Sequence, residues 1–164
     1  MPSKLILIGG MSRAGKSLLA RQLQLKVPNS IHIDQDDFVL PEEQIPTIKN
    51  RIDWEHPDGM NWPLLKSKIQ QASATNSLVI VEGIFAFNEA SIVTSADLKI
   101  YLDLNKEEFT IRRKQETRWG KEPEWYIEHV WTSHLKNANP HQIKFDLSQE
   151  FNEQLAVSVI SMLS

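Results

Sequence analysis

A glycine-rich octapeptide near the start of the chain constrains the fold more than any other feature. The pattern G-x-x-x-x-G-K-[ST] is met at every fixed position by Gly10-Met11-Ser12-Arg13-Ala14-Gly15-Lys16-Ser17. The short apolar run 4–8 precedes it, and residues 17–26 after it carry apolar side chains at helical spacing. A strand, a glycine-rich turn and a helix in this order direct backbone N–H groups and the positive end of the helix toward one point. The octapeptide is therefore predicted to be a phosphate-binding loop.

The residues of this loop have separate expected roles. The glycines allow the backbone to bend closely around an anion. We expect Lys16 to bridge the β- and γ-phosphates of ATP and to act in catalysis, and Ser17 to bind Mg²⁺. The residues of this segment predicted to hold the nucleotide are Gly10, Ser12, Arg13, Ala14, Gly15, Lys16, Ser17 and Leu18.

The rest of the chain predicts an α/β fold. Short apolar runs, expected to be buried strands, occur at 4–8, 30–33, 78–81, 98–104 and 143–147. Helical patterns are found after the capping residues Asn61 and Asn105 and at 17–26, 124–137 and 149–163, the last with Met162 facing inward. Residues 34–60 show little periodicity and are expected to be mostly loop with short helical pieces. The alternation predicts one domain over residues 1–164, with a parallel sheet covered by helices on both faces and ligands at the carboxyl ends of the strands.

Composition narrows the class of protein. The chain has 164 residues, of which 41% are hydrophobic and 24% charged, as expected for a single globular domain. It has no cysteine, which excludes disulfides and thiolate-bound metals. The net charge of −3 argues against general nucleic-acid binding, and the early apolar run is too short for a signal peptide or a membrane span. We therefore expect a cytoplasmic monomer or small homo-oligomer that contacts neither nucleic acid nor membrane.

Acidic residues at two strand ends indicate what is done to the phosphate. Asp36-Asp37-Phe38 follows the second predicted strand, where a carboxylate can face both Mg²⁺ and an acceptor hydroxyl. Glu82 follows the buried run 78–81, where it can hold the water shell of Mg²⁺. The alternatives are helix-capping acids and a solvated strand end. The predicted metal ligands are Ser17, Asp36 and Glu82.

Arginines on a later predicted helix can stabilise charge on a transferring phosphoryl group. Arg112 and Arg113 are adjacent, so their side chains diverge by ~100° and should serve different ligands. Arg118 follows shortly after, and a solvated face is the alternative for each of the three. The histidines show no metal-ligand spacing, and His129 and His134 are not expected to share a helix face.

One short segment is similar to the base-reading N-K-x-D motif of GTPases. It is Asn105-Lys106-Glu107-Glu108, which lacks the final Asp. No D-x-x-G stands at the expected place earlier in the chain. We therefore predict that Asn105 is a helix cap.

Together these residues resemble the nicotinamide riboside kinase and uridine kinase group of P-loop kinases. Beyond the phosphate loop, the resemblance rests on Ile33-Asp34-Gln35-Asp36-Asp37-Phe38, Asp53-Trp54-Glu55-His56-Pro57-Asp58, residues 80–88, Arg112-Arg113, and His129-Val130-Trp131 with Leu135-Lys136. The Gln-Asp-Asp-Phe, Trp-Glu and His-Val-Trp segments are more similar to nicotinamide riboside kinases. The Glu-His-Pro-Asp string is more similar to uridine kinases.

The resemblance implies a five-stranded sheet of order 2-3-1-4-5, a short lid at roughly residues 117–124, and transfer of the γ-phosphate of ATP to the 5′-hydroxyl of a nucleoside. It implies that Asp36 is the general base and that Arg112 and Arg118 join the nucleotide-binding residues. The residues that it assigns to the nucleoside are Asp36, Asp37, Phe38, Trp54, Glu55, Arg113 and Trp119, with Trp125 as a second candidate for the lid aromatic.

The predicted reaction is the phosphorylation of nicotinamide riboside to nicotinamide mononucleotide. A cationic nicotinamide ring favours an aromatic face beside a carboxylate, and Trp54 and Glu55 supply one of each. Two alternatives stay open. One is a kinase for uridine or cytidine, and the other is a nucleotide-dependent switch that hydrolyses slowly. The switch would need a base-reading motif and a water-positioning residue, and neither is evident in the sequence.

Overall fold

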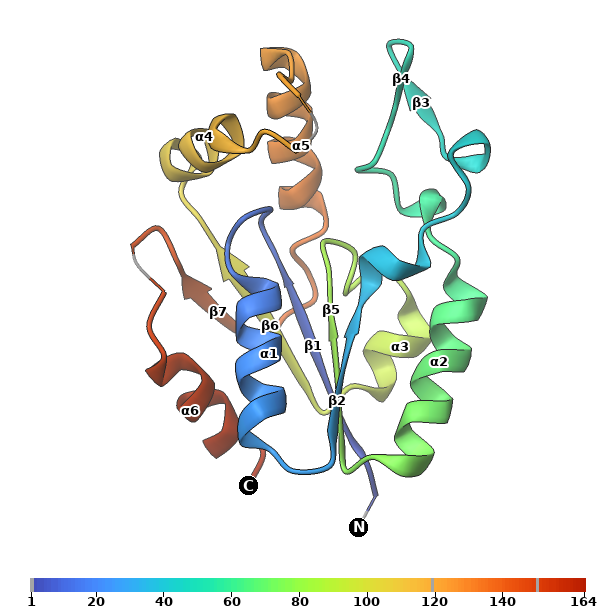
Figure 1. The fold of residues 1–164 in the computed structure, drawn as a ribbon, viewed down its shortest axis with the longest axis vertical. Helices are drawn as coiled ribbons and strands as arrows, with labels where there is room; N and C mark the ends of the chain where they lie inside the picture. Colours follow the sequence, from blue (N-terminus) through green and yellow to red (C-terminus); the bar gives the residue numbers. More distant parts are fainter. Residues whose placement is uncertain (1, 119, 150) are drawn as a thin grey trace.

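The computed structural model describes residues 2–118, 120–149 and 151–164, and it confirms the predicted α/β fold. Five parallel strands form one sheet in the order β2-β5-β1-β6-β7 (Figure 1). Counted along the chain without two short strands outside this sheet, this is the predicted order 2-3-1-4-5. The five strands are β1 (Lys4–Gly10), β2 (Ser30–Asp34), β5 (Leu78–Glu82), β6 (Leu98–Asp103) and β7 (Ile143–Asp146).

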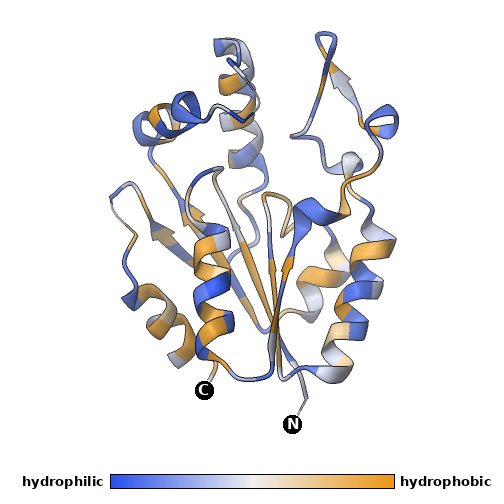
Figure 2. Cartoon of the chain, viewed as in Figure 1, coloured by the Kyte–Doolittle hydropathy of each residue, from blue (hydrophilic) through white to orange (hydrophobic). Residues whose placement is uncertain are grey.

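Helices cover both faces of the sheet, because side chains of successive strand residues point to opposite faces. Ile6 and Ile8 of β1 belong to one hydrophobic cluster, with α1 and α6 packed on it, whereas Leu5 and Leu7 belong to another, covered by α2 and α3 (Figure 1). Figure 2 shows the central strands as almost continuously hydrophobic. The α-helices of the described residues are α1 (Lys16–Lys26), α2 (Trp62–Thr75), α3 (Ala90–Ser95), α4 (Lys106–Gln115), α5 (Glu124–Lys136) and α6 (Gln154–Ser161).

Both predicted asparagine caps are confirmed. The side-chain oxygen of Asn61 accepts a hydrogen bond from the Leu64 N–H at 3.2 Å. Asn105 accepts in the same way from the Glu108 N–H at 2.8 Å. The N-K-x-E segment that is similar to a base-reading motif is therefore the start of α4, with its acidic residues in the first turn, where they oppose the helix dipole.

The short helical pieces predicted between β2 and α2 are present, but the small hairpin in the same segment was not predicted. The segment folds into three 3₁₀ turns, Gln35–Phe38, Glu42–Gln44 and Pro57–Gly59, and a small hairpin of β3 (Thr47–Ile48) and β4 (Arg51–Ile52). Two-residue strands are too short to give a period-2 pattern. Lys49 and Asn50, at the tip of the hairpin, adopt left-handed backbone angles with φ of 46° and 61°.

One helix was not predicted, and the predicted start and one predicted inward-facing residue of the last helix were wrong. The six-residue α3 was not predicted, since it spans fewer than two turns. The last helix begins at Gln154 rather than at 149, and it ends before Met162. Met162 is 43% exposed and does not face inward, because it lies in the C-cap, beyond the last regular turn.

The segments that carry the predicted site residues lie at one end of the sheet. The phosphate loop follows β1, the 3₁₀ turn with Asp36 follows β2, and Glu82 ends β5. Both termini lie at the opposite end (Figure 1). In the described ranges, none of the helices is both long and apolar enough to cross a bilayer.

Candidate active site

The phosphate loop is held in a strained, open shape by the neighbouring strand. Gly10 has φ of 145°, and a Cβ atom there would lie 2.3 Å from the backbone oxygen of Leu102 in β6. The Met11 N–H donates to that same oxygen at 3.0 Å. Gly15, with φ of 97°, precedes α1 and has no side chain to cap the helix. The first-turn N–H groups of α1 therefore face the loop, as an anion site requires.

Lys16 and Ser17, the first two residues of α1, point into the end of the sheet. The Lys16 Nζ donates to the Met11 oxygen at 2.9 Å, within the loop itself. Burial lowers the pKa of Lys16, and the carboxylates of Glu82 and Asp36 oppose this shift. The Ser17 hydroxyl donates to Glu82 Oε1 at 2.6 Å. The predicted phosphate and metal residues are thus together at one point.

Glu82 is 2% exposed and receives a second contact from His32, whose Nε2 lies 3.3 Å from the same Oε1. Burial favours the neutral acid and raises the pKa of Glu82. The hydrogen bond with His32, the charge of Lys16 and the hydrogen bond from Ser17 outweigh burial, so the pKa lies below its ordinary value. Glu82 is therefore a carboxylate at neutral pH.

Asp36 lies in the 3₁₀ turn after β2, and its N–H donates to Asp34 Oδ1 at 2.9 Å. The residue is exposed and lines a cavity. Partial desolvation, with the charge of Asp34 second, raises the pKa of Asp36 to about 6, although the charge of Lys16 opposes this shift. A carboxylate with a pKa near 6 is a competent proton acceptor at neutral pH.

The cavity has a volume of about 650 Å³ and lies between the phosphate loop, the segment between β2 and α2, and α5. Asp36, Trp54, Glu55 and Arg113, all predicted for the nucleoside, line it together. Trp54 is 45% exposed, so its ring is accessible to a ligand.

Asp37 and Phe38, also predicted for the nucleoside, do not line the cavity. Asp37 is exposed, and Phe38 packs against the core beneath α2. Successive residues of a 3₁₀ turn point about 120° apart, so the three residues of the Asp-Asp-Phe run face different ways.

The adjacent arginines diverge as predicted. Arg113 points into the cavity, where it binds both carboxylate oxygens of Glu122, at 2.8 and 3.0 Å, and the Ser12 hydroxyl at 2.9 Å. Arg112 points away from the cavity and donates to Glu108 and to the backbone oxygens of Arg13 and Leu147. The two guanidinium groups therefore contact neighbouring residues of the phosphate loop, Arg113 at Ser12 and Arg112 at Arg13.

Glu116, just before the predicted lid, connects Arg118 of that segment to Arg13 of the phosphate loop. This carboxylate accepts from Arg118 at 2.7 Å and from Arg13 at 2.9 Å. Trp119, the predicted lid aromatic, lies outside the described residues. Trp125, the second candidate, is covered by Lys49, whose Nζ lies 4.6 Å from the ring centroid.

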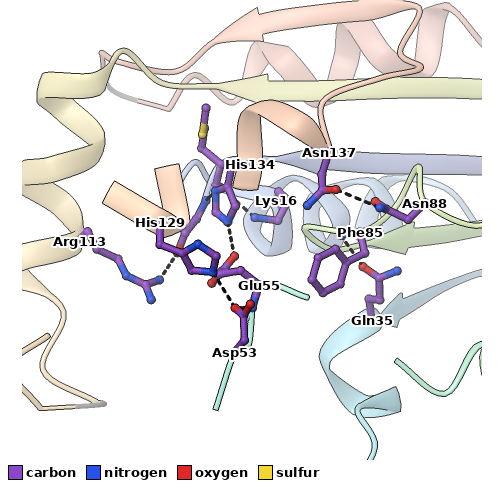
Figure 3. Close-up of polar contacts among 12 residues, drawn as sticks. Lys16, Gln35, Asp53, Glu55, Phe85, Asn88, Arg113, His129, His134 and Asn137 are labelled. Carbon is purple, nitrogen blue, oxygen red and sulfur yellow. Dashed lines mark hydrogen bonds and ion pairs between the residues drawn. The ribbon is translucent and has the colours of Figure 1, made fainter. Parts of the chain in front are cut away.

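Two histidines of α5 contact acidic residues of the site, although neither was predicted to be a site residue. His134 Nε2 lies 2.9 Å from Glu55 Oε2, and His129 Nε2 lies 2.8 Å from Asp53 Oδ1 (Figure 3). Burial raises the pKa of Glu55, but His134 and then Arg113 hold it below its ordinary value. Both pairs join residues more than 70 positions apart. Helical spacing could not have indicated them.

Gln35 is a further residue without a predicted role. Its side chain is 1% exposed, and its Oε1 accepts from the Phe85 N–H at 2.9 Å (Figure 3). Gly83 leaves room for this amide, since a Cβ atom at Gly83 would lie 2.2 Å from the same Oε1. Gln35 thus connects the turn that carries Asp36 to the loop after β5.

The residues present fit the chemistry of Mg²⁺ and a nucleotide. Among the residues that the structure describes, no group of three or more His, Asp or Glu side chains is arranged to hold a metal ion. Mg²⁺ does not need such a group, because it keeps several waters and takes one or two protein oxygens beside those of phosphates. The Ser17 hydroxyl beside Glu82, below an open helix N-terminus, is a donor set of that kind.

Comparison with known proteins agrees with this arrangement. Nicotinamide riboside kinase 1 of Homo sapiens is 29% identical over 155 residues, which cover 83% of this chain and 77% of that protein. Uridine kinase of Ureaplasma parvum is 26% identical over 137 residues, covering 66% of each chain. The chain is a homologue of nicotinamide riboside kinases and uridine kinases. The resemblance of its motifs to this group is thereby confirmed.

Solved structures confirm that the chain itself has the fold of the P-loop kinases. Thymidylate kinase from Candida albicans superposes with a TM-score of 0.66 at 18% identity, covering 99% of this chain and 91% of that one. Shikimate kinase from Bacteroides thetaiotaomicron gives a TM-score of 0.64 at 16% identity, covering 98% and 97%. No protein-family model matches the chain.

Proposed function

We propose that this protein is an ATP-dependent nucleoside kinase that transfers the γ-phosphate to the 5′-hydroxyl of nicotinamide riboside, giving nicotinamide mononucleotide. The observation that carries the proposal is the cavity that Asp36 shares with Trp54 and Glu55, directly beside the phosphate loop. A proton acceptor and an aromatic–carboxylate pair thus line the same cavity. The relatives named for nicotinamide riboside and for uridine support a nucleoside as the acceptor.

On this proposal, the phosphate loop and Lys16 hold the triphosphate of ATP, and Ser17 and Asp36 with Glu82 hold Mg²⁺. Bound Mg²⁺ would neutralise charge on the β- and γ-phosphates. Asp36 removes the proton of the 5′-hydroxyl, whose oxygen forms a bond to the γ-phosphorus as the bond between that phosphorus and the bridging oxygen of ADP breaks. Asp36 can do this because its raised pKa gives it enough basicity while it stays ionised at neutral pH.

Charge in the cavity supports a cationic nucleoside. Four carboxylates line it, those of Asp36, Asp53, Glu55 and Glu122, against the guanidinium groups of Arg51 and Arg113. The nicotinamide ring of the riboside carries a positive charge. The half-exposed ring of Trp54 offers that charge an aromatic face, and Glu55 lies next to it in sequence and in the cavity.

A second candidate is the phosphorylation of uridine or cytidine. It is favoured by the uridine kinase relatives and by His56, which lines the same cavity within the Glu-His-Pro-Asp string. A neutral base would gain less from Trp54 and Glu55 than a cationic ring does.

The test is ADP release from ATP and Mg²⁺ in the presence of nicotinamide riboside, uridine, cytidine or adenosine. We expect release only when an acceptor is added, with the highest kcat/KM for nicotinamide riboside. Activity on uridine with none on nicotinamide riboside would favour the second candidate. Slow release that no nucleoside changes would contradict both and favour the nucleotide-dependent switch.

A further inference from the structure

The His134 ring connects the nucleoside side of the cavity to the phosphate loop. Its Nδ1 accepts a hydrogen bond from the Ser12 N–H at 3.1 Å, and its Nε2 contacts Glu55 Oε2 at 2.9 Å. Figure 3 shows the ring pointing from α5 toward Glu55. The His134 side chain thus joins two predicted binding residues. Glu55 is predicted to contact the nucleoside, and Ser12 belongs to the loop that is predicted to contact ATP.

The surroundings of His134 fix both its position and its protonation. The residue is 2% exposed, and its ring packs edge-on against Phe109 with 6.0 Å between centroids. A backbone N–H can only donate, so Nδ1 must be the unprotonated nitrogen. The proton therefore resides on Nε2, which donates to Glu55. The neutral imidazole therefore accepts one hydrogen bond, from the Ser12 amide, and donates one, to the Glu55 carboxylate.

Ser12 is the residue of the phosphate loop that this connection orients. Its N–H is committed to His134, and its hydroxyl accepts from Arg113, which in turn binds Glu122 of the lid. Both polar groups of Ser12 therefore contact residues that line the cavity. The neighbouring Arg13 adopts a left-handed backbone with φ of 67°, so the loop is strained at the point where Ser12 is held.

Glu55 has an oxygen left over for a ligand. Its Oε2 is bonded to His134, and within the described residues Oε1 makes no hydrogen bond. A nucleoside hydroxyl that donates to Oε1 would fix the Glu55 carboxylate, and through it the His134 ring and the Ser12 amide. A ligand that orders shared groups lowers the ordering cost for the second ligand.

We propose that His134 is a positioning residue that couples the nucleoside site to the phosphate loop, so that nucleoside and ATP each bind more tightly when the other is present. This inference rests on the proposed nucleoside kinase function and adds a coupling between its two sites. Such coupling must be reciprocal, because the binding free energies of the two ligands form a closed cycle.

The experiment measures the Kd of a non-hydrolysable ATP analogue with Mg²⁺ by calorimetry, with and without a saturating nucleoside that the wild-type protein phosphorylates. We expect the nucleoside to lower this Kd by about fivefold to tenfold in the wild type. In His134→Phe, which keeps an aromatic ring but neither hydrogen bond, the ratio should fall to about one.

Two smaller changes separate the halves of the connection. In His134→Asn the amide oxygen can replace Nδ1 as acceptor for Ser12, but the side chain is too short to reach Glu55. In His134→Gln the amide nitrogen can replace Nε2 as donor to Glu55, while the bond to Ser12 is lost. Both variants should lose the coupling. The first should raise KM for the nucleoside, and the second should raise KM for ATP.

His129→Gln is the matched control, because His129 lies on the same helix and contacts Asp53 but not the phosphate loop. It should weaken nucleoside binding and keep the coupling ratio of the wild type. A ratio that stays at the wild-type value in both His134→Asn and His134→Gln would overturn the inference and leave His134 a packing residue. So would the absence of coupling in an active wild type. Failure of the proposed function is seen separately, as a wild type whose ADP release no nucleoside stimulates.

Discussion

The hydroxyl of Ser17 donates to Glu82 Oε1 at 2.6 Å, so the first turn of α1 and the end of β5 meet at a single oxygen. The two residues come from segments 65 positions apart. Their contact places the neutral and the ionised oxygen that we propose as Mg²⁺ ligands side by side, near the lysine of the phosphate loop. We therefore expect the largest losses of activity from substitutions at and around this contact.

Lys16→Ala should lower kcat by at least about 10², the usual effect of removing one preorganised donor to a developing charge. The fold should persist, since within the described residues the Lys16 Nζ makes one hydrogen bond, to the Met11 oxygen of its own loop. Steady-state ADP release and the far-UV circular dichroism spectrum check both halves. Lys26→Ala, at the exposed end of the same helix, is the control and should leave kcat unchanged. An active Lys16→Ala enzyme would exclude the proposed phosphate site.

Asp36→Asn should lower kcat by roughly 10² to 10⁴, because the amide cannot accept the proton of the hydroxyl. Glu82→Gln should lower kcat less if, as we propose, Glu82 acts only through the metal and its waters. Asp37→Asn changes the next residue, which is exposed and outside the cavity, and serves as the control. If Glu82→Gln is much the more severe, the base has been assigned to the wrong carboxylate.

The pH dependence of kcat/KM should report the titration of Asp36. Desolvation and Asp34 raise the pKa of this carboxyl from 3.8 to about 6, so protonation removes the base over a range in which most carboxylates stay ionised. We expect kcat/KM to rise with pH through about 6 and to fall about tenfold per unit below it. The residual activity of Asp36→Asn should lack this limb. A wild-type limb near pH 4 would contradict the assignment.

Trp54→Leu should raise KM for nicotinamide riboside by about tenfold with a smaller change in kcat. A cation–π contact in a partly desolvated site contributes ~1–2 kcal/mol, and 1.4 kcal/mol is a factor of ten in binding. The ring contacts ground state and transition state alike, so the effect should appear in KM. Kinetics with nicotinamide riboside and uridine in both enzymes make the comparison. Equal losses for the two nucleosides would show that Trp54 acts by packing alone.

Gln35→Leu should lower the free energy of unfolding by about 1–3 kcal/mol, because the Phe85 N–H would stay buried without an acceptor. Urea unfolding followed by fluorescence gives the value. Gln44→Leu, at an exposed position of the same segment, should change it by less than about 0.5 kcal/mol. Equal stability of the wild type and Gln35→Leu would show that the amide contributes nothing to holding the loop after β5.

The sequence was sufficient for the sheet and for the phosphate loop, because both depend on local patterns. An apolar run that ends in a glycine-rich turn before a helix specifies its own geometry, and the alternation of such units specifies a parallel sheet. The β3–β4 hairpin and α3 gave no such signal, since each is shorter than the window over which periodicity can be recognised. The residues that line the cavity were predicted only where a short segment resembled nicotinamide riboside kinases or uridine kinases.

The contacts between Glu55 and His134 and between Asp53 and His129 could not be predicted. They form between an irregular segment and a helix far along the chain. The spacing of residues within either segment does not indicate that the two are in contact. The same limit explains Asp37 and Phe38. A motif identifies a turn, but which of three consecutive side chains enters the cavity depends on the direction in which the turn leaves the sheet.

The segment between β2 and α2 rests on α5 through matched pairs. Beside the two carboxylate–histidine contacts, Lys49 lies over the ring of Trp125, and the Arg51 guanidinium lies 4.9 Å from the ring centroid of Tyr126. If this segment alone were replaced by that of a kinase of different specificity, its acidic and basic side chains would lack their partners, which lie on α5. The unit of exchange for changing the acceptor is therefore the segment together with α5, while the sheet and phosphate loop can remain as they are.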